Sequence, residues 1–275
     1  MSSFFKLSGG GNDFLALVEP EELPTTDQIR GWCARRHALG ADGLFVLERL
    51  PQGARMRHFN ADGGEAELCL NGTRCAARLA LYLGWAADEV LIETAFGSIL
   101  AHQPSATEIA LSLSRPEASP DHRRLHIRNT DLEGWWLVVG VPHFVIWWQK
   151  SLTTAPVEEL GALIRSHPVF GPAGTNVDFV RFPTSHHLEI RSFERGVEAE
   201  TLACGTGVIA AAATGLHLGS LDLPVEALTQ GGYRFQVLAD AENQLRWRLA
   251  GDARIVARGE LTPEAELGVA EPSWT

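Results

Sequence analysis

The sequence predicts a mixed α/β protein with two similar halves, and three observations support this prediction. Short β-forming runs alternate with a few helical segments along the 275 residues. Two distant segments share a glutamate, a cysteine and a glycine at matched spacings, which is typical of a duplicated domain. A polar segment with two prolines, residues 115–124, lies between them and is typical of an inter-domain linker.

The first half is expected to contain a hairpin, two helices and further strands. A glycine-rich turn at residues 9–11 separates the first two strands. A helix over residues 26–37 follows, with Thr26 or Asp27 as its N-cap. A second helix over residues 71–83 ends before Gly84, a residue type favoured just after a helix. The strands are expected at residues 4–7, 14–18, 44–50, 54–60, 90–94, 98–101 and 108–113.

The second half continues the mixed pattern. Helices are expected over residues 156–166 and 204–218, the latter ending before Gly219. Strands are expected at residues 135–139, 144–148, 176–181, 187–193, 233–238, 244–249 and 253–261. We therefore expect three parts: an N-terminal lobe at 1–119, a C-terminal lobe at 120–262, and a tail at 263–275 that packs back on the N-terminal lobe.

The matched segments are the strongest evidence for duplication. Glu65 precedes Cys69 by four residues, as Glu200 precedes Cys204. A glycine follows each cysteine by three residues, and both segments end in Leu-x-Leu-Gly with its glycine fifteen residues past the cysteine. A weaker echo relates residues 9–14 to residues 174–179. Two halves that each place one cysteine at the start of a central helix are what duplication would leave.

The composition argues against several classes of protein. Its 23 basic and 34 acidic residues give a net charge of −11, which disfavours a nucleic-acid partner. Hydrophobic residues make up 45% and charged residues 21%, which is too apolar for a disordered chain. Neither a signal peptide nor an apolar run long enough to cross a membrane is evident. We therefore expect a cytoplasmic protein with no membrane partner.

The cysteines and lysines argue against common cofactors. Four cysteines in a chain of this length do not form a disulfide scaffold, and the sequence has no CxxC pair and no HExxH motif. We therefore expect no metal. Lysine occurs only at Lys6 and Lys150, neither in a setting that suggests a Schiff base, so a pyridoxal cofactor is disfavoured too.

Two cysteines at helix starts suit one kind of chemistry. The positive end of a helix dipole lowers the pKa of a thiol and favours the thiolate. The free backbone N–H groups beside it can hold a carboxylate. If the two halves face each other, one thiolate can remove a proton α to that carboxylate while the opposite thiol delivers one. This would invert a stereocentre without a cofactor.

Other interpretations of the cysteines remain open. Each could be a small buried hydrophobe, which is the interpretation we favour for Cys33 and Cys75. For Cys69 and Cys204 the matched contexts favour chemistry. A metal site lacks histidines at ligand spacing, and a redox pair is usually close in sequence, whereas these two are 135 residues apart.

The motifs together resemble those of the diaminopimelate epimerases, pyridoxal-independent enzymes of lysine and peptidoglycan-precursor synthesis. The resemblance covers nearly the whole chain and is most specific at residues 69–75 and 200–207. Supporting motifs lie at residues 11–14, 40–44, 59–65, 142–143, 176–179 and 194–196. The resemblance implies two pseudo-symmetric lobes, each a curved, mostly antiparallel sheet wrapped around a central helix, with the active site in the cleft between them.

The resemblance also implies roles for individual residues. Cys69 and Cys204 would be the acid–base pair, with His143 near Cys69 and Glu194 beside Cys204. Asn12 would contact the amino group at the reacting centre. Helix-start residues would hold the reacting carboxylate, chiefly by backbone N–H groups: Leu70, Asn71, Gly72, Gly205 and Thr206. The distal amino-acid end would be bound by four residues: Asn60, Asn176, Glu194 (on the ammonium) and Arg195 (on the carboxylate).

Three departures from the family pattern leave the substrate open. Leu70 replaces a usual glycine, which narrows the site and would be strained at positive φ. Val141 replaces a usual asparagine before Pro142, and one extra residue lies within 197–199. The alternatives are a histidine or hydroxyproline racemase or epimerase on the same scaffold, and a non-catalytic amino-acid-binding protein. We expect diaminopimelate as the small-molecule substrate, no cofactor, and a homodimer as the assembly.

Overall fold

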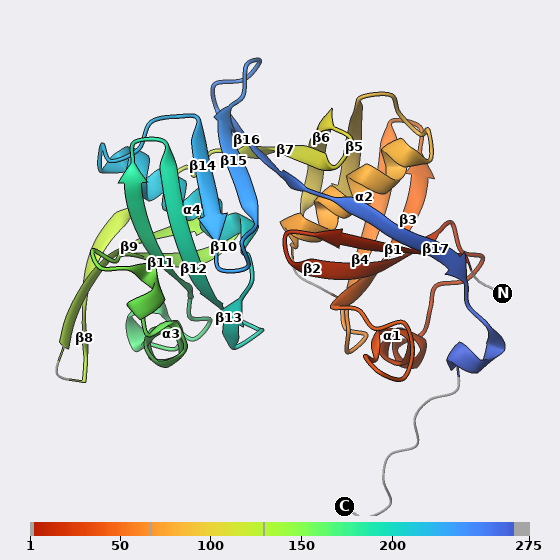
Figure 1. Ribbon diagram of the computed structural model, residues 1–275, viewed down its shortest axis with the longest axis horizontal. Coiled ribbons are helices and arrows are strands. Elements are labelled where there is room, and N and C mark those ends of the chain that lie inside the picture. The colour runs from red at the N-terminus through yellow and green to blue at the C-terminus, as the bar shows by residue number, and fades with distance from the viewer. Residues whose placement is uncertain (1–2, 66–67, 129, 267–275) are drawn as a thin grey trace, which may run out of the picture. The chain divides into compact units, whose positions relative to one another are not determined.

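The computed structural model describes residues 3–65, 68–128 and 130–266. The chain divides into two compact units. Figure 1 colours the chain by residue number, from red at the N-terminus to blue at the C-terminus. Unit 1 takes the residues up to Leu111 and those from Asp252 onward, and unit 2 takes the residues from Ser112 to Gly251. None of the helices in the described ranges has both the length and the apolar character that crossing a bilayer would need.

This division differs from the expected lobes at both boundaries. Residues 112–119 belong to unit 2 and residues 252–262 to unit 1. The physical reason for the second difference is strand pairing, because β17 (Arg254–Glu260) runs antiparallel to β1 (Ser3–Gly9). Beyond it, the short turn η3 (Pro263–Glu266) packs against α1 (Thr26–Cys33), where Ala265 joins the unit 1 core. Residues 267–275 of the expected tail lie outside the described residues.

Unit 1 is a mostly antiparallel sheet with two α-helices. Its helices are α1 and α2 (Leu70–Tyr82). Besides β1 and β17, its strands are β2 (Asn12–Val18), β3 (Gly43–Leu50), β4 (Gly53–Asn60), β5 (Glu89–Thr94), β6 (Gly97–Ser105) and the first part of β7 (Glu108–Ser114). The β2–β3 and β4–β5 pairs are parallel, whereas the β1–β2, β3–β4 and β5–β6 pairs are antiparallel.

Unit 2 has the same plan. Its helices are α3 (Val157–Arg165) and α4 (Gly205–His217), with short turns η1 (Leu152–Thr154) and η2 (Pro168–Phe170). Its strands are β8 (Asp121–Ile127), β9 (Thr130–Val139), β10 (Val141–Trp147), β11 (Asn176–Thr184), β12 (His187–Glu194), β13 (Ala199–Thr201), β14 (Val225–Thr229), β15 (Arg234–Ala239) and most of β16 (Arg246–Asp252).

The strand pairings of the two units correspond step by step. The series β9–β10, β10–β11, β11–β12, β12–β14 and β14–β15 is antiparallel, parallel, antiparallel, parallel and antiparallel. The series β1–β2, β2–β3, β3–β4, β4–β5 and β5–β6 has the same directions in the same order. Unrelated sheets would not share this order, so the topology supports the duplication that the cysteine segments predicted.

Each sheet has a different helix on each face, because successive side chains of a strand point to opposite sides. In unit 2, Phe144, Val177 and Phe193 pack in a core with residues of α3. The neighbouring positions therefore face α4, which contacts β9 to β12. In unit 1, Leu15 and Leu44 pack in a core with residues of α1, and the alternate positions face α2.

Some element predictions were wrong. The helix expected to end at residue 37 ends at Cys33, and Arg36 adopts a φ of 75° in the turn that follows. The expected linker overlaps β8, which pairs antiparallel with β9. The overlapping residues, 121–124, are polar because none of them is buried, whereas Leu125 and Ile127 of the same strand are buried. Strand β14 was not predicted.

The weaker echo was also wrong. Residues 9–14 span the β1–β2 turn, whereas residues 174–179 lead into β11, which corresponds to β3. The strand registers make Phe14 equivalent to His143, because each lies opposite the first residue of the next strand, Gly43 or Asn176. The Asp-Phe pairs at residues 13–14 and 178–179 therefore occupy positions that are not equivalent in the two units.

Candidate active site

Cys69 and Cys204 occupy the same position in equivalent helices. Cys69 is the N-cap of α2 at φ −115° and ψ 103°, and Cys204 is the N-cap of α4 at φ −114° and ψ 109°. Both helices have thirteen residues and are followed by a leucine C-cap and a glycine at positive φ, Gly84 or Gly219. The N–H groups of each first turn, which have no acceptor in a preceding helical turn, therefore lie beside a thiol, as the sequence predicted.

The glutamates four residues before the cysteines are equivalent as well. Glu65 forms an isolated bridge with Phe59, and its carboxylate pairs with Arg57 at 3.2 Å. Glu200 lies opposite Phe193 and pairs with Arg191 through two bonds of 2.6 Å. In both units an arginine of the preceding strand thus ties down the segment that leads to the cysteine.

Unit 2 concentrates polar groups on the face of its sheet that meets α4. His143, Asn176, Asp178 and Ser192 are all buried there. The Nδ1 atom of His143 lies 2.7 Å from Asp178 Oδ2, and Ser192 Oγ donates to Asp178 Oδ1 at 2.6 Å. The remaining ring nitrogen of His143 lies 3.5 Å from Asn176 Nδ2. Because a carboxylate only accepts, Asp178 holds His143 with Nδ1 as the donor and Nε2 as the acceptor.

Asp178 is a site residue that sequence reasoning missed. It lies in the motif at residues 176–179, in which the resemblance implies a role for Asn176 alone. The signal was present, because Asn176 and Asp178 are polar residues two apart among the apolar residues that begin β11, which places both on one face. A fully buried carboxylate in such a strand requires partners, and His143 and Ser192 provide them.

Cys204 lies among acidic groups. Its thiol donates a hydrogen bond to Glu194 and lies 3.4 Å from Thr206 Oγ1. Burial, followed by the charges of Glu194 and Asp178, raises the pKa of Cys204 well above 9.0. This corrects the expectation that the helix dipole favours its thiolate. Burial likewise raises the pKa of Glu194, which also accepts a short hydrogen bond from Thr201.

Unit 1 brings together Asn12, Asn71 and the start of α2. Asn71 Nδ2 donates to Asn12 Oδ1 at 2.8 Å and to the Gly10 carbonyl at 3.1 Å. Arg74, which is fully buried, donates a short hydrogen bond to Asn71 Oδ1. The backbone N–H of Gly72 lies 3.4 Å from Cys69 Sγ and donates to it. Predicted ligands of the substrate's amino and carboxylate groups are therefore neighbours here.

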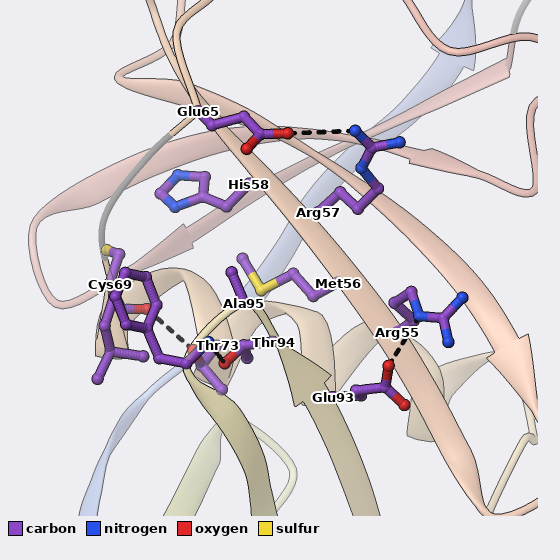
Figure 2. A pocket seen from close by; sticks show the side chains of 12 residues that line it. Arg55, Met56, Arg57, His58, Glu65, Cys69, Thr73, Glu93, Thr94 and Ala95 are labelled. Carbon is purple, nitrogen blue, oxygen red and sulfur yellow. Dashed lines mark hydrogen bonds and ion pairs between the residues drawn. The ribbon is translucent and has the colours of Figure 1, made fainter.

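Cys69, which is half-buried, lines a pocket of about 290 Å³ within unit 1 (Figure 2). The pocket lies between β4, the β5–β6 turn and the start of α2. Its charged side chains form the ion pairs Arg57–Glu65 and Arg55–Glu93. The remaining lining residues are Met56, His58, Leu68, Thr73, Thr94, Ala95 and Phe96.

The structure resolves the question of strain at Leu70. Leu70 is buried and begins α2, and within the described ranges the non-glycine residues at positive φ are Glu19, Arg36, Arg128 and Glu198. The leucine that replaces a family glycine is therefore unstrained.

Other predicted site residues lie at the ends of strands. Asn60 is exposed at the end of β4, and Arg195 follows β12, where its backbone N–H donates to Asn176 Oδ1 at 2.8 Å. Gly205 and Thr206 are buried in the first turn of α4. Val141 starts β10, at the position equivalent to Asn12 in β2. The proximity of His143 to Cys69, which belongs to the other unit, stays a prediction.

The remaining cysteines have the character of core residues. Cys33 and Cys75 are buried, with 3% and 0% of their surfaces exposed. Burial raises the pKa of Cys33 to about 11 and raises that of Cys75 further. Neither thiol is therefore suited to act as a base near neutral pH.

Comparison with known proteins identifies relatives over most of the chain. A family model described as diaminopimelate epimerase matches residues 4–111 and 135–256. The diaminopimelate epimerase of Aquifex aeolicus is 34% identical over 276 residues, covering 95% of this chain and 98% of that protein. That of Methanothrix thermoacetophila is 39% identical over 249 residues, covering 83% and 86%.

Solved structures share the fold at low sequence identity. A phenazine biosynthesis protein of the PhzF family from Enterococcus faecalis is 15% identical, with a TM-score of 0.70 over 95% of this chain and all of that chain. A hydroxyproline epimerase from Agrobacterium vitis is 14% identical, with a TM-score of 0.65 over 94% and 91%. These likenesses confirm the mixed α/β fold class.

Proposed function

Because the chain belongs to the diaminopimelate epimerase family, we propose that it interconverts LL- and meso-diaminopimelate without a cofactor. One observation carries the proposal. Two cysteines, Cys69 and Cys204, are the N-caps of equivalent helices in a duplicated fold. Each is thereby supplied with backbone N–H groups that suit a carboxylate.

The proposed reaction moves two protons. A thiolate takes the α-proton, so that an S–H bond forms and the electron pair of the broken C–H bond moves toward the carboxylate. The helix N–H groups of Leu70, Asn71, Gly205 and Thr206 stabilise the resulting negative charge. The second thiol then gives its proton to the opposite face of the carbon and becomes the thiolate. The stereocentre is inverted, and the two sulfurs have exchanged protonation states.

We assign the proton in the free enzyme to Cys204. Its raised pKa and its hydrogen bond to Glu194 support this assignment, because both keep the sulfur protonated. Cys69 would then start as the base for one stereoisomer, with His143 as its expected proton partner. The His143–Asp178 pair suits that task, since Asp178 fixes the ring with Nε2 as the acceptor.

The remaining residues are proposed to recognise the substrate. Asn12 would bind the ammonium at the reacting carbon, with Gly72 beside Cys69 in the same first turn. The distal end would be held by Asn60, Asn176, Glu194 and Arg195. Arg195 would pair with the distal carboxylate, which a simple amino acid lacks. A substrate without that end would leave these polar groups unmatched.

The test is α-proton exchange in D₂O. Wild-type protein is incubated separately with LL-diaminopimelate, meso-diaminopimelate, histidine and hydroxyproline, and deuterium at the α-carbon is measured by mass spectrometry. We expect exchange and interconversion with the first two. Cys69→Ser and Cys204→Ser should each lower epimerisation by about 10²–10⁴-fold, because a hydroxyl is a far weaker acid than a thiol. Cys33→Ala serves as the matched control.

The contrary outcomes are distinct. The wild-type protein could exchange the α-proton of histidine or hydroxyproline faster than that of diaminopimelate, at a rate that Arg195→Ala leaves unchanged. In that case the substrate is a simple amino acid, and the two-thiol reaction still holds. Full epimerase activity in either serine variant would contradict the two-thiol mechanism. Binding of diaminopimelate without any exchange would make this a non-catalytic descendant.

We further propose a cytoplasmic location and a homodimeric assembly. A reducing compartment suits a mechanism that needs two free thiols. Sedimentation equilibrium of the full chain under reducing conditions tests the assembly, and a single monomeric species would contradict it.

A further inference from the structure

Asn12 uses both ends of its side-chain amide. Its Oδ1 atom accepts from Asn71 Nδ2 at 2.8 Å, and its Nδ2 atom donates to Asp42 Oδ2 at 3.1 Å. Asp42 lies just before β3, and Asn12 is the first residue of β2, which pairs in parallel with β3. A carboxylate can only accept hydrogen bonds, so the side-chain nitrogen of Asn12 must face Asp42. Its side-chain oxygen then faces Asn71 at the start of α2.

Asp42 is itself held by several donors. The backbone N–H of Asp13 donates to the same Oδ2 atom at 3.1 Å, and Arg35 Nη2 donates to Oδ1 at 2.8 Å. Arg35 also binds both carboxylate oxygens of Asp13, to which Lys6 Nζ donates at 2.6 Å. These bonds lower the pKa of Asp13 to about 2 and raise that of Arg35, so both stay charged at neutral pH. The network therefore fixes the Asp42 carboxylate in place.

We infer that Asp42 is a positioning residue for the reaction, acting through Asn12. This inference rests on the proposed function, in which Asn12 binds the ammonium at the reacting carbon. An ammonium group needs an acceptor, and only the amide oxygen of Asn12 can supply one. If the amide turned over, its NH₂ group would face the ammonium and repel it. Asp42 excludes that orientation, while Asn71 satisfies only part of the accepting capacity of Oδ1.

The aspartate is specific for this task. Asp42 serves three donors, namely Asn12, Asp13 and Arg35. An asparagine at this position has one accepting oxygen, and we expect the charged Arg35 to hold it, because a charge-assisted hydrogen bond is stronger than one from a neutral amide. Asn12 would then face an NH₂ group and lose the bond that sets its orientation. Asp42→Asn is nearly isosteric, and the Asp42 side chain is 38% exposed, so the substitution should leave folding intact.

The test is a double-mutant cycle on kcat/KM for diaminopimelate. Asp42→Asn should lower kcat/KM by about 10- to 100-fold, since misplaced binding groups cost this much. Asn12→Ala should lower it at least as far. If Asp42 acts through Asn12, adding Asp42→Asn to Asn12→Ala should lower it no further. Asp27→Asn, which removes an exposed carboxylate paired with Arg30 on α1, is the matched control and should retain wild-type kcat/KM.

Two outcomes would overturn the inference. Additive losses in the cycle would mean that Asp42 acts independently of Asn12, and wild-type kcat/KM in Asp42→Asn would mean that it does not act at all. A second readout needs no substrate: the side-chain NH₂ signals of Asn12, identified in ¹⁵N spectra by their loss in Asn12→Ala, should shift in Asp42→Asn. Side-chain NH₂ signals of Asn12 that do not shift in Asp42→Asn would also contradict the inference. Failure of the proposed function is seen separately, as absent epimerisation by the wild type.

Discussion

The two candidate catalytic sulfurs have unlike neighbours at equivalent positions. Around Cys204 the α4 face of the sheet carries His143, Asp178 and Ser192, followed by Glu194. The registers make Phe14, Phe45, His58 and Asn60 their equivalents on the α2 face of unit 1. One half of the duplicated site therefore carries carboxyl groups, and the other carries two phenylalanines, a histidine and an asparagine. This difference supports the proposed roles, with Cys204 as the thiol and Cys69 as the base in the free enzyme.

His58 provides a prediction about stability and pH. Burial lowers its pKa from 6.5 to about 4, with its ring edge-on to Phe14 at 5.5 Å. The unfolded chain therefore binds a proton below about pH 6.5 that the folded protein refuses until about pH 4. The free energy of unfolding should fall as the pH drops through this window, by on the order of 3 kcal/mol from this group.

The measurement is urea unfolding at pH 7 and pH 4.5. His58→Leu should lose the part of the pH dependence that belongs to His58. His122→Leu alters a side chain that is 46% exposed and should keep the wild-type dependence. Equal pH dependence in wild type and His58→Leu would show that His58 does not contribute it.

Single residues of the site were predictable to different degrees. The matched segments singled out Cys69 and Cys204 before the resemblance gave them roles, and the structure places them at matching N-caps. Asp178 and Asp42 were quoted in motifs without a role. The roles proposed for them depend on contacts with a neighbouring strand, namely Asp178 with His143 and Asp42 with Asn12. Strand pairing of this kind has no local signal in the sequence.

At the scale of elements, the central helices were predicted within one residue at each end. A glycine at positive φ ends each of them, and glycine is the residue type that this backbone conformation favours. Polar strands were harder to predict, because the first four residues of β8 are polar and none of them is buried, so this part of the strand has the composition of a linker. The extended backbone of such a strand is stabilised by its partner β9, which the local composition does not reveal.

Two equivalent helix glycines should respond differently to substitution. A Cβ on Gly207 would lie 2.6 Å from Asp178 Oδ1, within the buried group that holds His143. A Cβ on Gly72 would meet Met56 Cε at 3.1 Å, the flexible end of a side chain. Gly207→Ala should therefore destabilise the protein by about 1–3 kcal/mol, the usual cost of overpacking a core. Gly72→Ala should stay within about 1 kcal/mol of wild type, because alanine favours the helix.

Thermal or urea unfolding of the two variants checks this pair. Both substitutions add the same methyl group at the third residue of an equivalent helix, so each is the control for the other. Equal stabilities would show that Asp178 can move aside, and that His143 is not held rigidly.

At the scale of the whole chain, the fold class and the duplication were predictable, but the unit to which the last strand belongs was not. The strand expected at residues 253–261 was assigned to the second lobe because it follows that lobe in sequence. It pairs instead with β1, across more than two hundred residues of intervening chain. Such a distant pairing depends on which strand of the first unit has an edge without a partner. In this chain that strand is β1, which pairs with β17.

This path predicts how fragments will behave. Unit 2 is continuous from Ser112 to Gly251, so a fragment of these residues should fold by itself. A fragment ending at Leu111 lacks β17 and leaves the edge of β1 without its partner, so it should be poorly folded until residues 252–266 are supplied. Circular dichroism and amide dispersion in NMR spectra measure both. A well-folded 1–111 fragment would contradict the role of β17.

The final prediction concerns the thiols of both units. The proposed mechanism requires Cys69 and Cys204 to reach opposite faces of one carbon, so without substrate they should come within reach of a disulfide. Oxidation should therefore abolish epimerisation, and a reductant should restore it. Cys33 and Cys75 should stay reduced, because each is buried within unit 1 and neither lies at a helix start, where the proposed mechanism brings two sulfurs together. Peptide mapping by mass spectrometry identifies the linked pair, and bound diaminopimelate should protect it. Reversible inactivation without a Cys69–Cys204 link would mean that the two sulfurs do not act on the same carbon.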